Sequence, residues 1–358
     1  MAMKYRWLAE RLEEMIQKNI QNGVNKLPTE QELCARYRVS RQTVRNALSL
    51  LKERGLIERR QGSGSFITGR SLSPLGNQAA ILISDDQEYL YPGVLSDIRK
   101  RLTESGFSAR VLVTENQVET ERELLLELLK NPPGGIIAEG CKTALPNPNL
   151  ALYRELEKKG CPAVFLYSYY PALENSLYVK DDNAAGSALL VEHLASLGHR
   201  SIAGIFKGDD MQGVERYQGF AETMFRLGLP FSDRRIGWYG SRELDRLIER
   251  KDTGFLRDMA RDVLSSCTAV VCYNDLLAYH LTGELLSMGF RLPADMAVTA
   301  FDNTYLSNVG SLSVTTLSHR PHEMGTKAAD LLVRKKSGLP VFSWEARWEL
   351  NLKESTKT

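Results

Sequence analysis

Three amphipathic segments open the chain and predict three helices. In the first, apolar residues recur at helical spacing: Leu8, Leu12, Met15, Ile16 and Ile20. Thr29 followed three residues later by Glu32 has the spacing of a capping box, so a second, short helix is expected there. A third helix is expected over residues 41–54, with Ser40 as its N-cap.

The third helix has two chemically different faces. An apolar stripe, which we expect to be buried, consists of Val44, Ala47, Leu48 and Leu51. The helix also presents polar side chains near its start: Arg41, Gln42, Thr43, Arg45 and Asn46. Arg can make bidentate hydrogen bonds to guanine, and Gln and Asn can do the same to adenine. A short helix, a tight turn and a helix of this kind predict a DNA-binding helix-turn-helix.

A β-hairpin is predicted directly after the third helix. Residues 56–60 and 65–68 read as short strands, and the turn between them contains Gly62 and Gly64. Glycines in such a turn let the backbone approach DNA phosphates. The hairpin is therefore interpreted as the wing of a winged helix-turn-helix.

These segments resemble the GntR family of winged-helix regulators over residues 4–68. The resemblance rests on Leu27-Pro28-Thr29-Glu30-x-Glu32-Leu33, Val39-Ser40-Arg41-x-Thr43-Val44-Arg45 and Gln61-Gly62-x-Gly64-x-Phe66. It implies DNA contacts by the start of the third helix, the start of the second helix and the tip of the wing. The residues concerned are Gln31, Ser40, Arg41, Thr43, Arg45 and Gly62.

Charge separates this region from the rest of the chain. Residues 1–70 hold 14 Lys and Arg against 7 Asp and Glu, whereas the remainder holds 32 against 37. Only the first part has the electrostatics of a phosphate-backbone binder. We therefore predict a DNA-binding domain over residues 1–69, a polar linker over 70–78 and an effector-binding and dimerisation domain over 79–358.

Short apolar strands alternate with helices in the large domain. Strands are predicted at residues 79–84, 109–113, 135–138, 163–166, 202–206, 269–273 and 297–301. Helices are predicted at residues 94–104, 119–130, 150–159, 183–196, 216–227 and 275–288. This order is typical of a parallel, doubly wound sheet, and seven strands over this length suggest two such α/β subdomains.

Ligands of open α/β sheets bind beyond the carboxyl ends of the strands. The residues found there include several tyrosines and groups of both charges: Tyr89, Tyr91, Glu139, Tyr167, Tyr169, Tyr170, Lys207, Asn274, Asp275 and Asp302. Carboxylates, amides and cations can hydrogen-bond to hydroxyls, and an aromatic ring can cover a C–H face. This mixture favours a neutral polyol, since a phosphate or carboxylate ligand would favour more Arg and fewer acids.

The large domain resembles the periplasmic-binding-protein-like (type I) core of the LacI family. The resemblance rests on Asp181-Asp182-Asn183, Leu197-Gly198-His199-Arg200, Arg216-x-x-Gly219-Phe220, Asn274-Asp275-x-x-Ala278 and Ala300-Phe301-Asp302-Asn303. It implies that Arg216, Asn274 and Asp302 bind the effector.

A GntR-type head on such a core is similar to the AraR class of arabinose repressors. That similarity implies L-arabinose as effector, with Glu139, Lys207 and a tyrosine after the first strand in the pocket. We select Tyr91 and Tyr169 among the tyrosines. Another pentose, a hexose or a nucleoside remains the alternative ligand.

Catalytic, metal and cofactor sites are not expected. The sequence has no Walker loop, G-x-S-x-G elbow or H-E-x-x-H motif, and its five cysteines form no C-x-x-C pair. A sugar-modifying enzyme is the remote alternative. The N-terminus lacks the apolar region of a signal peptide, so a cytoplasmic protein is expected. We predict a homodimer that binds two-fold symmetric operator DNA and is released by sugar.

Overall fold

The computed structural model describes most of the chain. The residues it describes are 5, 7–9, 11–12, 15–16, 19, 26–37, 39–53, 56–60, 64–67, 75–86 and 90–357. The chain divides into two compact units, Met1–Gly76 and Asn77–Thr358. In the part of the chain that the structure describes, no helix is long and apolar enough to cross a membrane.

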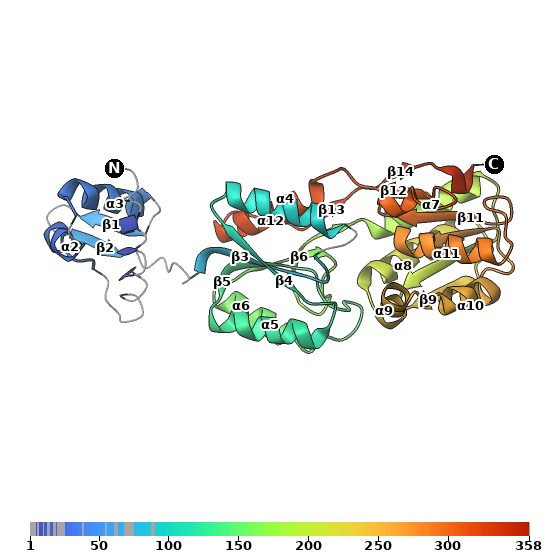
Figure 1. The fold of residues 1–358 in the computed structure, drawn as a ribbon, viewed down its shortest axis with the longest axis horizontal. Coiled ribbons are helices and arrows are strands. Elements are labelled where there is room, and N and C mark those ends of the chain that lie inside the picture. The colour runs from blue at the N-terminus through green and yellow to red at the C-terminus, as the bar shows by residue number, and fades with distance from the viewer. Residues whose placement is uncertain are drawn as a thin grey trace. The chain divides into compact units, whose positions relative to one another are not determined.

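The N-terminal unit is a small helical domain with a hairpin. Its elements are α2 (Glu30–Tyr37), α3 (Arg41–Glu53), β1 (Ile57–Arg60) and β2 (Gly64–Ile67), and the described positions between residues 5 and 19 are helical (Figure 1). β1 and β2 pair antiparallel, with Ile57 opposite Ile67. The predicted apolar stripe of α3 is buried against Leu8, Leu12 and Ile16, which confirms the helix-turn-helix core.

Both predicted N-caps of this unit are present. The Thr29 backbone N–H donates to Glu32 Oε2 at 2.7 Å, and the Glu32 N–H donates to Thr29 Oγ1 at 3.3 Å, which makes a reciprocal capping box. The Thr43 N–H donates to Ser40 Oγ at 3.2 Å at the start of α3. These caps fix where each helix begins, because they satisfy N–H groups that have no partner inside the helix.

The second unit contains two α/β lobes. The first lobe has a six-stranded sheet in the order β13-β7-β6-β5-β3-β4. Its strands are β3 (Leu75–Ile83), β4 (Ser108–Val113), β5 (Pro133–Ala138), β6 (Ala163–Tyr167), β7 (Leu177–Asp181) and β13 (Trp344–Ala346). Helices α4 (Tyr91–Glu104) and α12 (Glu323–Lys336) cover one face, and α5 (Val118–Lys130) and α6 (Leu150–Lys158) cover the other (Figure 1).

The second lobe repeats this plan. Its sheet has the order β14-β12-β11-β10-β8-β9, and the strands are β8 (Ile202–Lys207), β9 (Ile236–Tyr239), β10 (Ala269–Cys272), β11 (Ala297–Phe301), β12 (Thr315–Ser318) and β14 (Glu349–Asn351). β14 pairs antiparallel with β12, and the other recorded pairs are parallel. One face packs on α7 (Asn183–Ser196) and α8 (Met211–Arg226), and the other on α9 (Ser241–Arg250), α10 (Gly254–Asp262) and α11 (Asp275–Ser287).

The chain crosses between the lobes three times. The crossings run from β7 to α7, from β12 to α12 and from β13 to β14. All three leave from or arrive at strands on the same side of each sheet. This side is therefore the connected edge of the two lobes, and β4 and β9 form the opposite edge.

The prediction of two doubly wound subdomains is confirmed, and the structure adds elements that the pattern did not indicate. The strands that were missed are three to five residues long and lack the continuous aliphatic run of the equally short β10: β7, β9, β12, β13 and β14. Three helices, α9, α10 and α12, were also missed. β3 begins at Leu75, so the end of the predicted linker belongs to the sheet; residues 68–74 lie outside the described residues.

Candidate functional site

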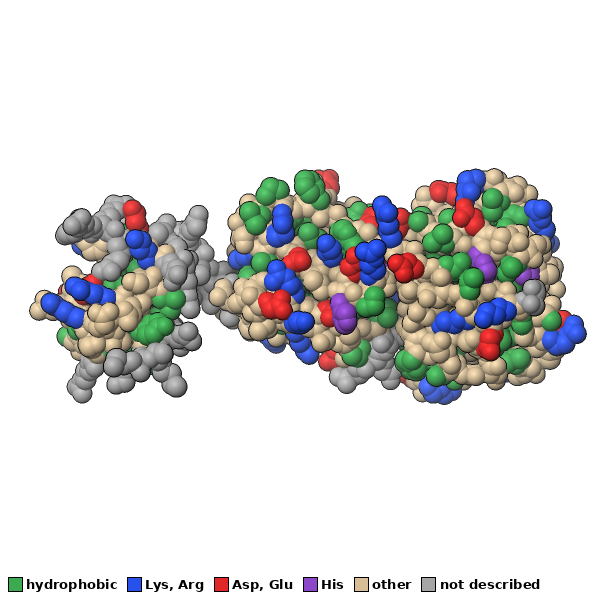
Figure 2. Space-filling model, turned by 90° about the horizontal axis from the view of Figure 1, so that it is seen from above, with side chains coloured by type: hydrophobic (Ala, Val, Ile, Leu, Met, Phe, Trp, Pro, Cys, Tyr) green, Lys and Arg blue, Asp and Glu red, His purple; other side chains and the backbone are tan. Residues whose placement is uncertain are grey.

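The start of α3 presents polar side chains to solvent. Arg41 and Arg45 are exposed, and so is the cap residue Ser40, while Thr43 is half-buried beside it with its hydroxyl 2.8 Å from Ser40 Oγ. Gln31 is exposed on α2. Lys and Arg side chains stand out on this unit, whereas both charges are interspersed on the larger one (Figure 2).

Arg45 is held by a neighbouring helix. Its Nε lies 3.1 Å from Glu30 Oε2 on α2, and 58% of the Arg45 side chain remains exposed. The pair joins the two helices of the motif through Nε and leaves the Arg45 side chain largely accessible. Gly62, the predicted wing-tip contact, lies outside the described residues.

In the large unit, Glu139 and Tyr91 come together at the carboxyl ends of the central strands. Glu139 follows β5, and its Oε2 accepts hydrogen bonds from the Ser84 backbone N–H at 2.8 Å and hydroxyl at 2.7 Å. Tyr91 Oη donates to Glu139 Oε1 at 3.1 Å. Burial raises the pKa of Glu139, with the nearby Asp210 carboxylate adding to the shift, while the Ser84 bonds oppose it. Tyr89 lies outside the described residues.

Two other residues of the first lobe each have a buried polar atom that makes no hydrogen bond within the described part of the chain. Tyr167 ends β6 with a backbone φ of +64°, and its ring lies edge-on to Tyr91 at 6.5 Å. Neither Tyr167 Oη nor Asp181 Oδ1 has a hydrogen-bond partner among the described residues. Burial raises the pKa of Asp181 to about 6, although His319 and Arg216 oppose the shift. Asp181 Oδ1 lies 3.9 Å from His319 Nε2. A buried polar atom without a hydrogen bond costs free energy, so both atoms are suited to bond a polar ligand.

Arg216 is the central cation of the second lobe. It is only 2% exposed, and its Nε donates to Asn183 Oδ1 at 2.9 Å. Nη1 donates to the Tyr273 carbonyl, and Nη2 lies 3.6 Å from Asp302 Oδ1. The guanidinium also lies 4.1 Å from the centre of the Phe301 ring. These contacts hold the planar group rigidly, as recognition of a small polar ligand requires.

Gly219 explains part of the Arg216-x-x-Gly219-Phe220 motif. A Cβ at this position would lie 2.2 Å from the backbone carbonyl oxygen of Ala184. α7 and α8 can therefore approach closely only because residue 219 lacks a side chain. This approach brings Arg216 on α8 within reach of Asn183 on α7.

Lys207 ends β8 and faces two carboxylates. Its Nζ lies 3.7 Å from Asp209 Oδ1 and 3.9 Å from Asp210 Oδ2. Tyr273 Oη donates to Asp210 Oδ2 at 2.9 Å, and the Tyr273 ring lies 4.8 Å from the Arg216 guanidinium. Lys207 is thus linked to Arg216 through Asp210 and Tyr273.

We call the resulting group the polar cluster: Ser84, Tyr91, Glu139, Tyr167, Asp181, Lys207, Asp210, Arg216, Tyr273 and Asp302. Its two halves lie close enough to affect each other: Asp210 raises the pKa of Glu139, and Asp302 raises the pKa of Tyr167. It draws residues from both lobes at the carboxyl ends of their strands, which is where a ligand of this architecture binds.

Two of the predicted effector residues stand apart from this hydrogen-bond network. Asn274 Oδ1 accepts from the Leu277 N–H at 3.0 Å and caps α11, which leaves its amide group to donate. Tyr169 stacks on Tyr178 with 4.5 Å between ring centres. Because the positive φ of Tyr167 ends the strand alternation, Tyr169 does not continue its direction. The structure favours Tyr167 over Tyr169 as the ligand-facing tyrosine.

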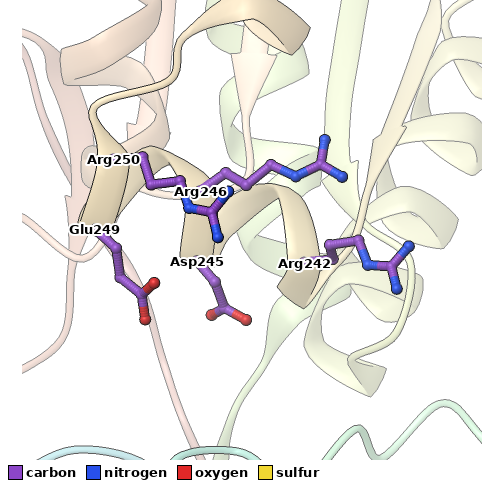
Figure 3. A pocket seen from close by; sticks show the side chains of 5 residues that line it. All are labelled: Arg242, Asp245, Arg246, Glu249 and Arg250. Carbon is purple, nitrogen blue, oxygen red and sulfur yellow. The ribbon is translucent and has the colours of Figure 1, made fainter.

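A surface pocket lies elsewhere, along α9 (Figure 3). It is lined by Arg242, Asp245, Arg246, Glu249 and Arg250, all from this one helix. Exposed side chains of both charges on one helix are typical of a solvated face. We therefore place the candidate ligand site at the polar cluster.

Family models match both parts of the chain. Residues 4–67 match the model of bacterial regulatory proteins of the gntR family, and residues 191–343 match a periplasmic binding protein-like domain. Among solved structures, the transcription regulator CcpA of Lactococcus lactis has a TM-score of 0.68 at 17% identity, covering 78% of this chain and 99% of that one. A complex of the regulator CelR with cellobiose has a TM-score of 0.66 at 22% identity, covering 92% and 100%. These likenesses show the fold.

Two curated relatives are more similar in sequence. The arabinose metabolism transcriptional repressor of Halalkalibacterium halodurans is 32% identical over 93% of this chain and 89% of its own length. Its namesake from Geobacillus stearothermophilus is 33% identical over 93% and 92%. The predicted resemblance is confirmed, and these relatives are regulators rather than enzymes. The chain therefore belongs to the family of arabinose metabolism transcriptional repressors, and it is a sugar-responsive, DNA-binding repressor.

Proposed function

We propose that this repressor is a cytoplasmic homodimer that binds operator DNA through α3 and is released from it by L-arabinose bound at the polar cluster. The observation that carries the ligand site is a pair of buried atoms that make no hydrogen bond within the described residues, Tyr167 Oη and Asp181 Oδ1, the latter near Arg216 and 3.9 Å from His319 Nε2. Hydroxyls of a sugar can donate to the carboxylate and accept from the phenol.

The charge of the cluster favours a neutral ligand. Four carboxylates, those of Glu139, Asp181, Asp210 and Asp302, face two cations, Arg216 and Lys207. A sugar phosphate or sugar acid would add another negative charge to this buried group, which costs free energy. The choice of arabinose among neutral sugars rests on the relatives' names.

The proposal is tested in two steps with the full chain. Thermal unfolding is measured with a panel of pentoses, hexoses and nucleosides, and a selective rise with L-arabinose is expected, since a ligand of the folded state stabilises it. Fragments of host genomic DNA that the protein binds are then isolated as operator fragments. The protein is titrated against these fragments with and without sugar. Saturating L-arabinose should lower DNA affinity about tenfold or more, within the usual range of coupling free energies. Unchanged DNA affinity would contradict the repressor mechanism, and stabilisation by another sugar would reassign the effector.

Asp181 offers a pH test of the site. Because its folded-state pKa of about 6 lies above the ordinary 3.8, the charged form lowers stability, and this cost grows as pH rises through that window. Replacing Asp181 with Asn should therefore raise the free energy of unfolding at pH 8 by up to about 3 kcal/mol. The same change should weaken L-arabinose binding.

Urea unfolding at pH 5 and pH 8 measures this effect without ligand. We expect the gain from Asp181→Asn to be smaller at pH 5 than at pH 8. Asp182→Asn is the matched control, since Asp182 caps α7 by accepting from the Ala185 N–H at 3.1 Å and Asn can cap equally well. A gain that does not depend on pH would show that Asp181 is not held as an unfavourable buried charge.

A further inference from the structure

The two lobes also meet at the edge opposite their connections. Asn116 follows β4 and Ser241 follows β9, the strands farthest from the crossings. Asn116 Nδ2 donates to Ser241 Oγ at 2.9 Å, and Asn116 Oδ1 accepts from the Lys142 N–H at 3.0 Å. One side chain thus ties two loops of the first lobe to the start of α9 in the second.

Thr143, which follows β5, makes a second link closer to the centre of the sheets, to residues that follow β8. Its Oγ1 donates to Asp210 Oδ1 at 3.1 Å and accepts from the Met211 N–H at 3.1 Å. Ser168 Oγ lies 2.6 Å away and is left to donate, because a hydroxyl has one proton and two lone pairs. Thr143 is 3% exposed, so its hydroxyl is shielded from water.

A backbone bond adds to this link. The Ala144 N–H donates to the Asp209 carbonyl at 3.3 Å. Gly213 permits the close approach of α8 to the end of β8, since a Cβ there would lie 2.0 Å from the Lys207 carbonyl oxygen. The start of α8, which carries the acceptor Asp210 and the donor Met211, is thereby fixed against β8.

We propose that these cross-lobe contacts form a latch that sets how long the sugar stays bound. The latch consists of Asn116, Thr143 and Ala144 of the first lobe and Asp209, Asp210, Met211 and Ser241 of the second. In strand order the polar cluster lies between the Asn116–Ser241 contact, at the β4 and β9 edge, and the crossings: Ser84 follows β3, Glu139 follows β5 and Tyr167 ends β6. Thr143 also follows β5, and it borders the cluster through Asp210. A ligand held there leaves only when the lobes separate. The crossings are covalent, so the lobes separate by breaking the contacts of the latch. The inference rests on the proposed sugar site.

The latch is also connected to the cluster by shared atoms. Asp210 uses Oδ1 for Thr143 and Oδ2 for the Tyr273 hydroxyl at 2.9 Å. The Tyr273 carbonyl in turn accepts from Arg216. Thr143 is therefore a positioning residue: it acts on the ligand through Asp210 and Tyr273.

The test combines Thr143→Val with Ser241→Ala, which removes both side-chain links and keeps the backbone. Ser241 is chosen over Asn116 because Asn116 has φ of +52°, a conformation that alanine adopts poorly. Thr143→Ser is the matched control, because it keeps the hydroxyl. The variant loses three hydrogen bonds between the lobes: Thr143 to Asp210, Met211 to Thr143 and Asn116 to Ser241. We expect an increase of about tenfold or more in the dissociation rate of L-arabinose, with little change in its association rate.

Two measurements separate the latch from the sugar. Stopped-flow tryptophan fluorescence gives the L-arabinose rates, and hydrogen exchange of the sugar-free full chain reports the amides of Ala144 and Met211. The double variant should exchange faster at these amides and release sugar faster, while Thr143→Ser resembles the parent protein. Unchanged exchange, or an unchanged dissociation rate despite faster exchange, overturns the latch. If the parent protein binds no sugar, the proposed function fails, and the exchange result still decides whether the lobe contact exists.

Discussion

An Arg216→Ala variant is expected to lose its response to L-arabinose while still binding DNA. The change removes the hydrogen bonds to Asn183 and the Tyr273 carbonyl, and it leaves the carboxylate of Asp302, 3.6 Å away, without its buried cation. Truncating one partner of a buried charge pair costs several kcal/mol, so sugar affinity should fall about 100-fold or more. Fluorescence anisotropy of labelled DNA, titrated with sugar, measures both properties in one experiment.

DNA affinity in the absence of sugar serves as the internal check, since α3 belongs to the other unit. Arg216→Lys is the companion variant: it keeps a positive charge near Asp302 and loses the planar fork that bonds Asn183 and the Tyr273 carbonyl together. An intermediate loss of sugar affinity in Arg216→Lys and a full loss in Arg216→Ala would show that both the charge and the planar shape of the guanidinium are needed to bind the sugar. Release from DNA by L-arabinose at the normal concentration in Arg216→Ala would remove Arg216 from the effector site.

The candidate ligand site is only partly predictable from sequence, because not all of the strands that carry its residues have a clear sequence signal. Glu139 follows β5, a strand with a clear apolar run, and it was identified by its position. Asp181 ends β7, whose sequence LYVKD mixes aromatic, aliphatic and charged residues over five positions. Because the pattern does not predict that strand, it does not place Asp181 at the carboxyl end of a strand, where ligand-binding residues are expected. Recognition of β7 would have placed Asp181 beside the other candidates.

Lobe-to-lobe contacts were beyond the reach of pattern reasoning. Thr143 and Asn116 lie in loops without periodicity, and their partners Asp210 and Ser241 are far along the chain. Only the sheet order brings the ends of β4 and β9 to the same edge, and that order depends on short strands with little sequence signal. In contrast, the N-terminal unit was predicted well because caps and helical periodicity are local properties.

In the N-terminal unit, Arg45→Ala should weaken operator binding about 10- to 100-fold and relax discrimination at one base pair. Arg45 is exposed in the second turn of α3, where helix-turn-helix proteins contact base edges. Its pair with Glu30 is largely exposed, so losing it should change stability by less than about 1 kcal/mol. Anisotropy titrations on an operator fragment that the protein binds and on unrelated DNA measure affinity and specificity together.

Two further variants distinguish DNA reading from a structural role of Arg45. Lys52→Ala removes an exposed charge from the last turn of the same helix and should leave specificity unchanged. Glu30→Gln breaks the ion pair and keeps Arg45, so it should preserve or strengthen DNA binding, because a competing carboxylate is gone. If Glu30→Gln instead weakened binding as much as Arg45→Ala did, the pair itself would be the important feature. A loss of DNA affinity in Arg45→Ala together with a gain in Glu30→Gln would show that Arg45 contacts the DNA.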